Sequence, residues 1–454
     1  MKELTLSQIA AWCGAALPEE QRNIRITGVE SDSRAIAPGD LFIALKGERV
    51  DGHDFLAAAA KNGAAAALVS HPVETELPCL IVEDTLRAYG AIAAGYRELL
   101  GLRVIGITGS VGKTTTKEMI AAVLQQRYRT VKTAQNFNND IGVPVMLLRI
   151  TPEDEVAVLE MGMNHFGELS VLTRLAKPDL ALITNVGTMH IENLGSREGI
   201  LQAKLEILEG LRPGGRVVFC GDNDLLSREA ARYGALTFGL GAGCDVRGSD
   251  VRTHDGQTDF TVTAGKLRFP VTLPLTGEHN VLDALAAAAV GLDFGISPET
   301  IGTALHSFQN TGHRQRLLSL GGIQVIDDCY NAGPESMRAA LNVLAQAKGR
   351  RIAVLGGMLE LGDFAPQAHF EVGAYAAGRA ELLYAYGDNS EQYVRGAKEN
   401  GLTRAERFDS HEELYAALRT ELRPGDTVLL KGSRGMHMER VLERLTEETK
   451  IGGM

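Results

Sequence analysis

GITGSVGKTTTKEM, at residues 106–119, carries an apolar strand into a glycine-rich turn and then into a helix. Glycines let backbone N–H groups approach phosphate oxygens closely, and the N-terminus of a helix adds positive partial charge. Lys113 would contact the outer phosphates of a nucleotide, and the hydroxyl of Thr114 would face Mg2+. Ile107 stands where the strict P-loop spacing has its first glycine, but the remaining residues of the motif are present. We therefore predict that this turn binds ATP or GTP.

The same strand, turn and helix pattern continues on the C-terminal side of the turn. Further apolar runs that end in turn residues begin at Val156, Leu180 and Arg216. Such runs predict a parallel sheet that is buried on both faces. Between residues 245 and 275 the apolar residues alternate with polar ones, which predicts a β-hairpin elaboration, and an Ala-rich helix is expected at 280–292.

The two ends of the chain predict further α/β domains. Residues 1–100 mix short strand-like runs with Ala-rich helical ones such as 55–67, and a new strand and helix series starts near Gln324 with QVIDD, IAVLGGM, ELLYAYGD and DTVLLKGS. A chain of 454 residues is also too long for one hydrophobic core. We predict an α/β protein with a small N-terminal domain at 1–100, a P-loop-type domain with a mostly parallel sheet and helices on both faces at 101–312, and a Rossmann-like domain at 313–454.

Composition excludes several classes of protein. The 57 acidic residues outnumber the 46 basic ones, which disfavours a general nucleic-acid binder. The five cysteines include no CxxC pair, which disfavours a disulfide framework and a zinc site and favours the reducing cytoplasm. No stretch approaches 18 uninterrupted apolar residues, and the N-terminus does not have the pattern of a signal peptide, so no membrane span is expected.

Three residues outside the turn are candidates for chemistry. Glu160 ends an apolar strand, where a carboxylate could reach Mg2+ held by the nucleotide. His190 follows another strand on a loop, and Lys204 lies on a helical stretch. By spacing alone, residues of these three kinds are more often packed or solvated side chains than ligands. The residues themselves leave ligase, kinase and motor activities open.

Taken together, however, the segments resemble the Mur ligases, in order and over essentially the whole chain. The resemblance rests on TGSVGKTTTKEM, NFNNDIGVP, LEMGMNHFGEL, NVGTMHIENLGS, GEHNVLDALAA, DDCYNAGPESM, VLGGMLELG and LLKGSRGMHME. It implies an ATP-dependent ligase of peptidoglycan synthesis that joins D-alanyl-D-alanine to UDP-N-acetylmuramoyl-tripeptide through an acyl phosphate, and that acts as a cytoplasmic monomer. A diaminopimelate- or lysine-adding ligase or a folylpolyglutamate synthetase is the nearest alternative, and an ATP-driven conformational switch is a more distant one.

The resemblance also assigns roles to residues. Lys113 would stabilise the transferring phosphoryl group, Thr114 and Glu160 would hold one Mg2+, His190 would hold a second, and Lys204 would be carbamylated to become a metal ligand. The nucleotide would contact Gly109, Ser110, Val111, Gly112, Lys113, Thr114, Thr115, Asn280, Arg314, Asp328 and Tyr330. Asn280 would meet the adenine. Arg316 is an alternative to Arg314, and Asp327 an alternative to Asp328 as the ribose contact.

The substrates are expected at two further groups of residues. By resemblance, the UDP-sugar end of the acceptor would bind at Ser33, Arg34, Lys46, Gly47 and Asp51. A strand that meets a helix N-terminus would present Lys431, Ser433 and Arg434 to a phosphate or to the dipeptide. The sequence departs from the family pattern in two places, with Gly333 where Asn is usual and Gly357 where Asp is usual.

Overall fold

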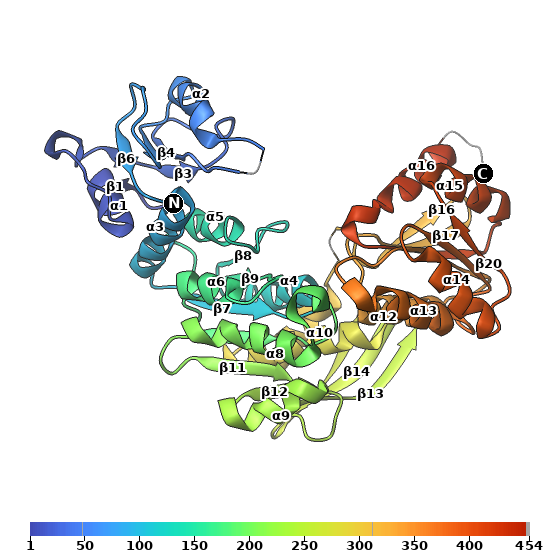
Figure 1. Cartoon of the computed structure of the whole chain (residues 1–454). Coiled ribbons are helices and arrows are strands. Elements are labelled where there is room, and N and C mark those ends of the chain that lie inside the picture. Colours follow the sequence, from blue (N-terminus) through green and yellow to red (C-terminus); the bar gives the residue numbers. More distant parts are fainter. Residues whose placement is uncertain (48, 311, 451–454) are drawn as a thin grey trace. The chain divides into compact units, whose positions relative to one another are not determined.

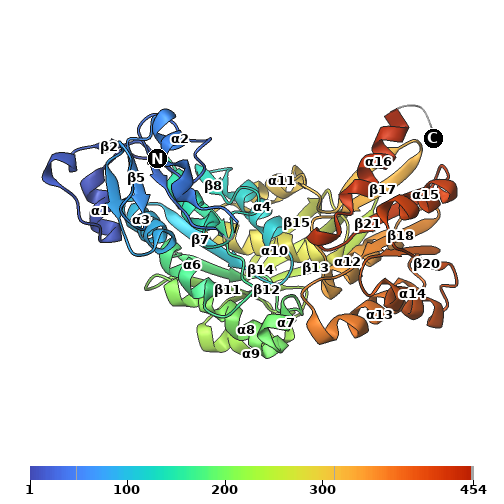
Figure 2. The same ribbon diagram turned by 45° about the horizontal axis from the view of Figure 1, so that its top comes forward.

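The structure of the protein is a computed structural model that describes residues 1–47, 49–310 and 312–450 (Figures 1 and 2). The chain divides into two compact units. The first comprises Met1–Thr108, Leu124–Ile183 and Ala203–Val218, and the second comprises Gly109–Val123, Thr184–Gln202 and Phe219–Met454. No helix in the described ranges is long and apolar enough to cross a membrane. The predicted domain boundaries at residues 100 and 312 stay predictions, and the predicted end at 454 lies outside the described residues.

The N-terminal residues have the predicted mixture of strands and helices, and four of the strands form a small parallel sheet. Its strands, in spatial order, are β3 (Gly28–Glu30), β4 (Asp40–Ile43), β5 (Ala66–Val69) and β6 (Cys79–Ile81). Every residue of β4 and β5 is buried, including the charged Asp40 at the start of β4. The short strands β1 (Leu4–Thr5) and β2 (Arg25–Ile26) pair separately, and α1 (Leu6–Cys13) and α3 (Thr85–Leu99) follow β1 and β6.

The predicted helix over residues 55–67 is wrong in its second half. The helix α2 covers only Leu56–Lys61, after a short 3-10 turn at Gly52–Phe55. Gly63 adopts a φ of 99°, which favours glycine and ends the helical path. The last two alanines of the expected helix belong to β5 instead.

The nine-stranded sheet has the order β15-β14-β13-β12-β11-β10-β7-β9-β8. Its parallel part includes β7 (Arg103–Thr108), β8 (Thr130–Lys132), β9 (Val156–Glu160) and β10 (Leu180–Ile183). All residues of β9 and β10 are buried, so both faces are covered, as the apolar runs predicted. The helices that alternate with these strands are α4 (Lys113–Leu124), α5 (Gly142–Arg149), α6 (Glu168–Ala176), α7 (Ile191–Leu194) and α8 (Arg197–Leu205).

The expected β-hairpin elaboration is present at the other end of this sheet. After β11 (Arg216–Cys220), α9 (Asp224–Tyr233) and β12 (Leu236–Gly239), the antiparallel strands β13 (Val246–His254), β14 (Gln257–Ala264) and β15 (Leu267–Leu273) follow. The alternating apolar residues face one way: Phe260 is paired with Val271, and Val262 with Phe269, all buried. The Ala-rich helix α10 (Glu278–Asp293) packs against β12 and β13, and α11 (Pro298–His306) packs against β15.

The C-terminal residues form the predicted Rossmann-like arrangement. The sheet order is β16-β17-β21-β18-β19-β20, parallel except for the β16–β17 pair. The strands are β16 (Arg316–Leu320), β17 (Ile323–Asp328), β18 (Arg351–Gly356), β19 (Leu382–Tyr386), β20 (Ala405–Phe408) and β21 (Thr427–Lys431). Figures 1 and 2 show α12 (Pro334–Ala345), α13 (Ala365–Ala376) and α14 (Ser390–Glu399) on one face of the sheet, and α15 (His411–Glu421) and α16 (Glu439–Lys450) on the other.

Candidate active site

The glycine-rich turn lies between β7 and α4, as predicted. Ile107 is the buried penultimate residue of β7 and pairs with Glu160, so the strand extends past the position where the strict P-loop spacing has a glycine. Gly109 has φ 155° and Gly112 has φ 83°. A Cβ atom at Gly109 would lie 1.8 Å from Oγ1 of Thr184, and one at Gly112 would lie 2.7 Å from Oδ1 of Asp283. Only glycine fits these two positions.

The segment that follows β10 holds the turn in place. The backbone N–H of Ser110 donates to the carbonyl of Asn185 (3.1 Å), and the N–H of Val111 donates to Oδ1 of the same asparagine (3.0 Å). The hydroxyl of Thr184 donates to the carbonyl of Val111 (2.6 Å), and the N–H of Gly187 donates to Oγ of Ser110 (2.9 Å). The sequence signal for this clamp was the NVG run directly after a buried strand, but neither Thr184 nor Asn185 was predicted.

Lys113, the first residue of α4, folds back over the turn. Its Nζ donates to the carbonyl of Gly109 (2.7 Å) and lies 3.4 Å from that of Ser110. Thr114 and Thr115 occupy the half-buried first turn of the helix. An ammonium group and a helix N-terminus above a glycine cradle form the arrangement that binds phosphate groups. These residues therefore fit the phosphates of a nucleotide.

A buried carboxyl group, that of Asp283, contacts the turn and the start of α4. Asp283, on α10, accepts a hydrogen bond from the hydroxyl of Thr116 (2.7 Å) and is 7% exposed. Burial raises the pKa of Asp283 to about 7, against the opposing charge of Arg314. This residue was not among the predicted site residues, because a polar position on an Ala-rich helix gives no signal of its own.

The predicted nucleoside contacts lie in two groups. Asn280, also on α10, is buried, and its Nδ2 donates to the carbonyl of Thr276 (2.7 Å) and to Oε1 of Gln315. The guanidinium of Arg314 stacks on the ring of Tyr330, 4.0 Å from its centroid. Arg316, the alternative to Arg314, is exposed at the start of β16.

The two candidate aspartates at the end of β17 have different surroundings. Asp327 is fully buried, and its Oδ2 pairs with Nδ1 of His313 (2.7 Å). Asp328 is half-buried, and its Oδ2 accepts from Nζ of Lys431 (2.6 Å) while its Oδ1 accepts from the N–H of Gln315 (3.2 Å). The carboxylate of Asp328 is thus the more accessible of the two.

The remaining predicted metal ligands belong to both compact units of the chain. In the first unit, Glu160 ends β9 as predicted, 3% exposed, and its Oε1 accepts from Nδ2 of Asn138 (2.9 Å). Lys204, on α8, is 2% exposed. In the second unit, His190 follows β10 on a loop with φ 64°, and its Nδ1 lies 2.5 Å from Oε2 of Glu360 without an aligned hydrogen bond.

Glu160 and His190 offer atoms that can bind a metal ion, whereas an unmodified Lys204 does not. Within the described ranges, no group of three or more His, Cys, Asp or Glu side chains is arranged to hold a metal ion. The Glu160 carboxylate offers the oxygen that Mg2+ prefers, and the buried Nδ1 of His190 is a donor atom without an aligned partner. An ammonium at Lys204 offers no lone pair, whereas a carbamate would offer two oxygens.

The predicted acceptor residues lie on loops at one edge of the N-terminal sheet. Ser33 and Arg34 follow β3, and Lys46, Gly47 and Asp51 follow β4. Because β3 and β4 are parallel neighbours, their carboxyl ends, and these loops, share an edge, which is where open α/β sheets bind ligands.

Ion pairs and hydrogen bonds between side chains stabilise the conformation of these loops. Arg34 pairs with Asp32 (2.7 Å) and lowers the pKa of that carboxyl to about 2. Oδ1 of Asp51 lies 2.6 Å from Nδ1 of His53, whose Nε2 accepts from the N–H of Ser70 (3.0 Å), just after β5. His53 therefore joins the β4 and β5 loops. It was missed because its link to Ser70, which follows another strand, gives no signal in the sequence around His53.

The helix N-terminus predicted at Lys431, Ser433 and Arg434 is present only as the start of a short 3-10 helix, with Ser433 at its N-cap. Lys431 ends β21 as expected, but the next element is a three-residue 3-10 turn at Arg434–Met436, and α16 begins only at Glu439. His437 has φ 49°, which interrupts the helical path. The hydroxyl of Ser433 instead links the carbonyl of Ala332 (3.1 Å) and the N–H of Leu359 (2.9 Å).

The two departures from the family pattern lie at crowded positions. A Cβ atom at Gly333 would lie 2.8 Å from Cγ of Met189, and one at Gly357 would lie 3.0 Å from the carbonyl oxygen of Asp388. A larger side chain at either position would displace its neighbour. Glycine at these positions is therefore matched to the packing around it.

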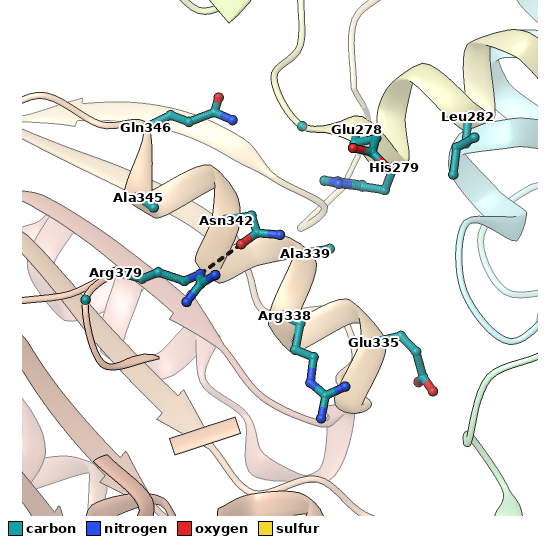
Figure 3. Close-up of a pocket in the computed structure, with 12 residues that line it drawn as sticks. Glu278, His279, Leu282, Glu335, Arg338, Ala339, Asn342, Ala345, Gln346 and Arg379 are labelled. Carbon is teal, nitrogen blue, oxygen red and sulfur yellow. Dashed lines mark hydrogen bonds between the residues drawn. The ribbon is translucent and has the colours of Figure 1, made fainter. Parts of the chain in front are cut away.

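A cavity of about 820 Å³ lies beside the start of α10 (Figure 3). Glu278, His279 and Leu282 line it on one side, and Glu335, Arg338 and Asn342 of α12 face them. Nε of Arg379 donates to Oδ1 of Asn342 (2.9 Å), as Figure 3 shows. Because His279 precedes Asn280, the cavity adjoins the predicted adenine contact.

Comparison with known proteins gives consistent matches over the whole chain. Residues 25–128 match the family model "Mur ligase family, catalytic domain", 107–291 match "Mur ligase middle domain", and 313–434 match "Mur ligase, glutamate ligase domain". The UDP-N-acetylmuramoyl-tripeptide--D-alanyl-D-alanine ligase of Bacillus subtilis is 41% identical, covering 98% of this chain and 99% of that protein. Crystal structure I of MurF from Acinetobacter baumannii superposes with a TM-score of 0.91 at 35% identity, over 98% of this chain and 99% of that one. The structure of MurF ligase from Thermotoga maritima in complex with ADP superposes with a TM-score of 0.86 at 30% identity, over 94% of this chain and 98% of that one.

Proposed function

The chain belongs to the Mur ligase family, and we propose that it joins D-alanyl-D-alanine to UDP-N-acetylmuramoyl-tripeptide, with cleavage of ATP, in peptidoglycan precursor synthesis. The observation that carries the proposal is the extent of the similarity. The match to the Bacillus subtilis ligase of that name covers 98% of this chain, so it includes the substrate-binding regions as well as the nucleotide turn.

The chemistry begins with activation of the acceptor. A carboxylate is a poor electrophile, so its oxygen first attacks the γ-phosphorus of ATP and releases ADP. The amine of D-alanyl-D-alanine then attacks the carbonyl carbon of the acyl phosphate, forms the amide and releases inorganic phosphate. Lys113 neutralises charge on the phosphoryl group, while the amides of the turn and the start of α4 position it.

The rest of the ATP site comes from α10 and the C-terminal residues in this proposal. Asn280 contacts the adenine and Arg314 reaches the phosphates, in keeping with the effect of its charge on Asp283, which contacts the turn. Asp328 binds the ribose, which its half-buried position supports, and Tyr330 holds Arg314 by stacking. Gly109, Ser110, Val111, Gly112, Thr114 and Thr115 complete the cradle.

Mg2+ neutralises charge on the transferring phosphoryl group and orients it when bound. We assign Thr114 and Glu160 to one ion, and His190 with a carbamylated Lys204 to a second. Lys204 is buried at 2% exposure, and a carbamate there would offer oxygen atoms to a cation, which an ammonium cannot do.

The acceptor and the dipeptide bind at separate places in this proposal. Ser33, Arg34, Lys46, Gly47 and Asp51 receive the UDP-sugar, where two loops share the carboxyl edge of a parallel sheet. Lys431, Ser433 and Arg434 take part in binding the phosphate or the dipeptide, although Lys431 is paired with Asp328 in this structure.

The proposed enzyme is a cytoplasmic monomer with three domains. The enzyme acts as a monomer in the cytoplasm, and the five cysteines, all free, suit a reducing compartment. Its domains are the acceptor-binding residues 1–100, the ATP-binding residues 101–312, and residues 313–454, which complete the ATP and dipeptide sites.

A substrate panel tests the proposed activity. Purified protein is supplied with ATP, Mg2+ and UDP-N-acetylmuramoyl-tripeptide, and phosphate release is compared with D-alanyl-D-alanine, diaminopimelate, lysine or glutamate as the amine. We expect release with D-alanyl-D-alanine alone. Phosphate release only with a free amino acid would assign the protein another activity of the family. Equal phosphate release without any amine would favour an ATP-driven switch.

A further inference from the structure

Asp283 is an acidic group built into the floor of a site that receives phosphate. Its Oδ1 accepts from the hydroxyl of Thr116 at 2.7 Å, and the same oxygen fills the space that a side chain at Gly112 would need. Both contacts come from the turn and the first part of α4, which carry the phosphate-binding amides. The carboxyl group therefore packs directly against the backbone that would hold the nucleotide.

The charged groups around Asp283 come from three elements. Gly112 and Thr116 from the turn and α4 bring no formal charge, although Lys113 lies between them with its ammonium on the carbonyl of Gly109. Arg314, after α11, attracts the carboxylate. His279, one turn earlier on α10, contributes little positive charge, because burial lowers its pKa.

A nucleotide changes this balance. Its phosphates bring negative charge to the turn and compete with the carboxylate for the positive groups there. In a buried site two like charges are not held together, and one of them is neutralised by a proton. Within the described ranges, Asp283 is an ionisable acid whose side chain contacts Thr116 and lies against Gly112 of the turn.

We propose that Asp283 is a positioning residue that binds the turn in its protonated form, so that nucleotide binding is accompanied by the uptake of a proton from solvent. The proposal rests on the proposed ATP-dependent function. The protonated carboxyl keeps one oxygen as acceptor for Thr116 and opposes no phosphate charge. The ionised form keeps the hydrogen bond but repels the phosphates.

This arrangement has a defined pH dependence. Burial already places the pKa of Asp283 at about 7, and bound phosphate raises it further. As pH rises through 7 the binding-competent, protonated fraction of Asp283 falls, by roughly tenfold in total between pH 6 and pH 8. The apparent Kd for the nucleotide therefore rises roughly tenfold between pH 6 and pH 8, since affinity scales with the competent fraction.

Calorimetry on the full chain tests the proposal. A non-hydrolysable ATP analogue saturated with Mg2+ is titrated at pH 6, 7 and 8, in two buffers with different ionisation enthalpies, which gives the protons taken up per nucleotide. We expect uptake of about half a proton at pH 7, where the group is half ionised. The Asp283→Asn variant keeps an oxygen acceptor for Thr116 but cannot ionise. It should bind as the parent does at pH 6, without that uptake and without the rise in Kd.

Matched controls separate this effect from general changes in charge. Asp255→Asn removes an exposed carboxylate at the tip of the β13–β14 hairpin and should leave both the uptake and the pH profile of the parent unchanged. Equal uptake in the parent and in Asp283→Asn would overturn the proposal. So would pH-independent binding by the parent, even if the variant failed to fold. Failure of the parent to bind nucleotide at every pH would overturn the ATP-dependent function as well.

Discussion

Gly109→Ala perturbs the turn at its most crowded point. The new Cβ atom would lie 1.8 Å from Oγ1 of Thr184, which donates the hydrogen bond that holds Val111. The alanine at position 109 would also have to adopt the φ of 155° that Gly109 has, which L-residues rarely do. The turn cannot keep its present conformation with alanine, so the substitution lowers either the free energy of unfolding or the affinity for the nucleotide.

The size of that cost follows from two terms. A non-glycine residue in such a backbone region costs about 1–3 kcal/mol. Displacement of Thr184 from Val111 costs about 1 kcal/mol more. Together they amount to roughly 2–4 kcal/mol, or roughly 30- to 1,000-fold in affinity if the whole cost falls on nucleotide binding.

Two measurements on the Gly109→Ala variant together give the total free-energy cost of the substitution. Chemical denaturation gives the change in the free energy of unfolding, and calorimetric titration with an ATP analogue gives the change in binding free energy. We expect the two losses to add to roughly 2–4 kcal/mol. Gly101→Ala is the matched control, because a Cβ atom there would have no neighbour within 4 Å. Its losses should be near zero.

A second substitution tests the steric part of the reasoning. Thr184→Ala removes the oxygen against which the new Cβ collides, so the double variant should recover part of the loss, and the two changes should not be additive. A Gly109→Ala protein that is as stable as the parent and binds nucleotide with unchanged affinity would refute the conformation described for the turn.

Three further substitutions test the assigned roles. Lys113→Ala should lower kcat for ligation on the order of 10²–10³-fold, as expected for loss of a charge-stabilising donor, and a near-normal rate of product formation would remove the lysine from the chemistry. Lys204→Ala should weaken Mg2+ binding on the order of 10–100-fold, and bicarbonate should stimulate the parent but not the variant; a fully active variant would exclude a carbamate. His53→Ala should raise KM for the UDP-linked acceptor roughly 5- to 30-fold through the loss of two hydrogen bonds, whereas a change confined to KM for ATP would contradict the location of the acceptor site.

Local patterns in the sequence predicted much of the fold. The buried strands β7, β9, β10, β17 and β21 are apolar runs between turn signals, and the alternation in β14 and β15 follows from one buried face. β20 was not expected, because as an edge strand with exposed Glu406 and Arg407 it has no apolar run.

The candidate site was predictable only where a motif lies within one segment. The glycine turn, Glu160 and Lys204 were placed on the correct elements. Thr184, Asn185, Asp283 and His53 were missed, since each acts through a partner far away in the chain. The early end of the 3-10 helix that begins at Arg434 was not predictable, because the left-handed residue that delays α16 is His437 and gives no glycine signal.

Transfer of oxygen from the acceptor to phosphate tests the central claim most directly. UDP-N-acetylmuramoyl-tripeptide labelled with 18O in its reacting carboxylate is incubated with the protein, ATP, Mg2+ and D-alanyl-D-alanine, and the released phosphate is analysed by mass spectrometry. An acyl-phosphate ligase leaves one acceptor oxygen in each phosphate, so we predict one 18O per phosphate and an amide product of the corresponding mass. Unlabelled phosphate would show that water had attacked ATP, and would contradict activation of the acceptor by this protein.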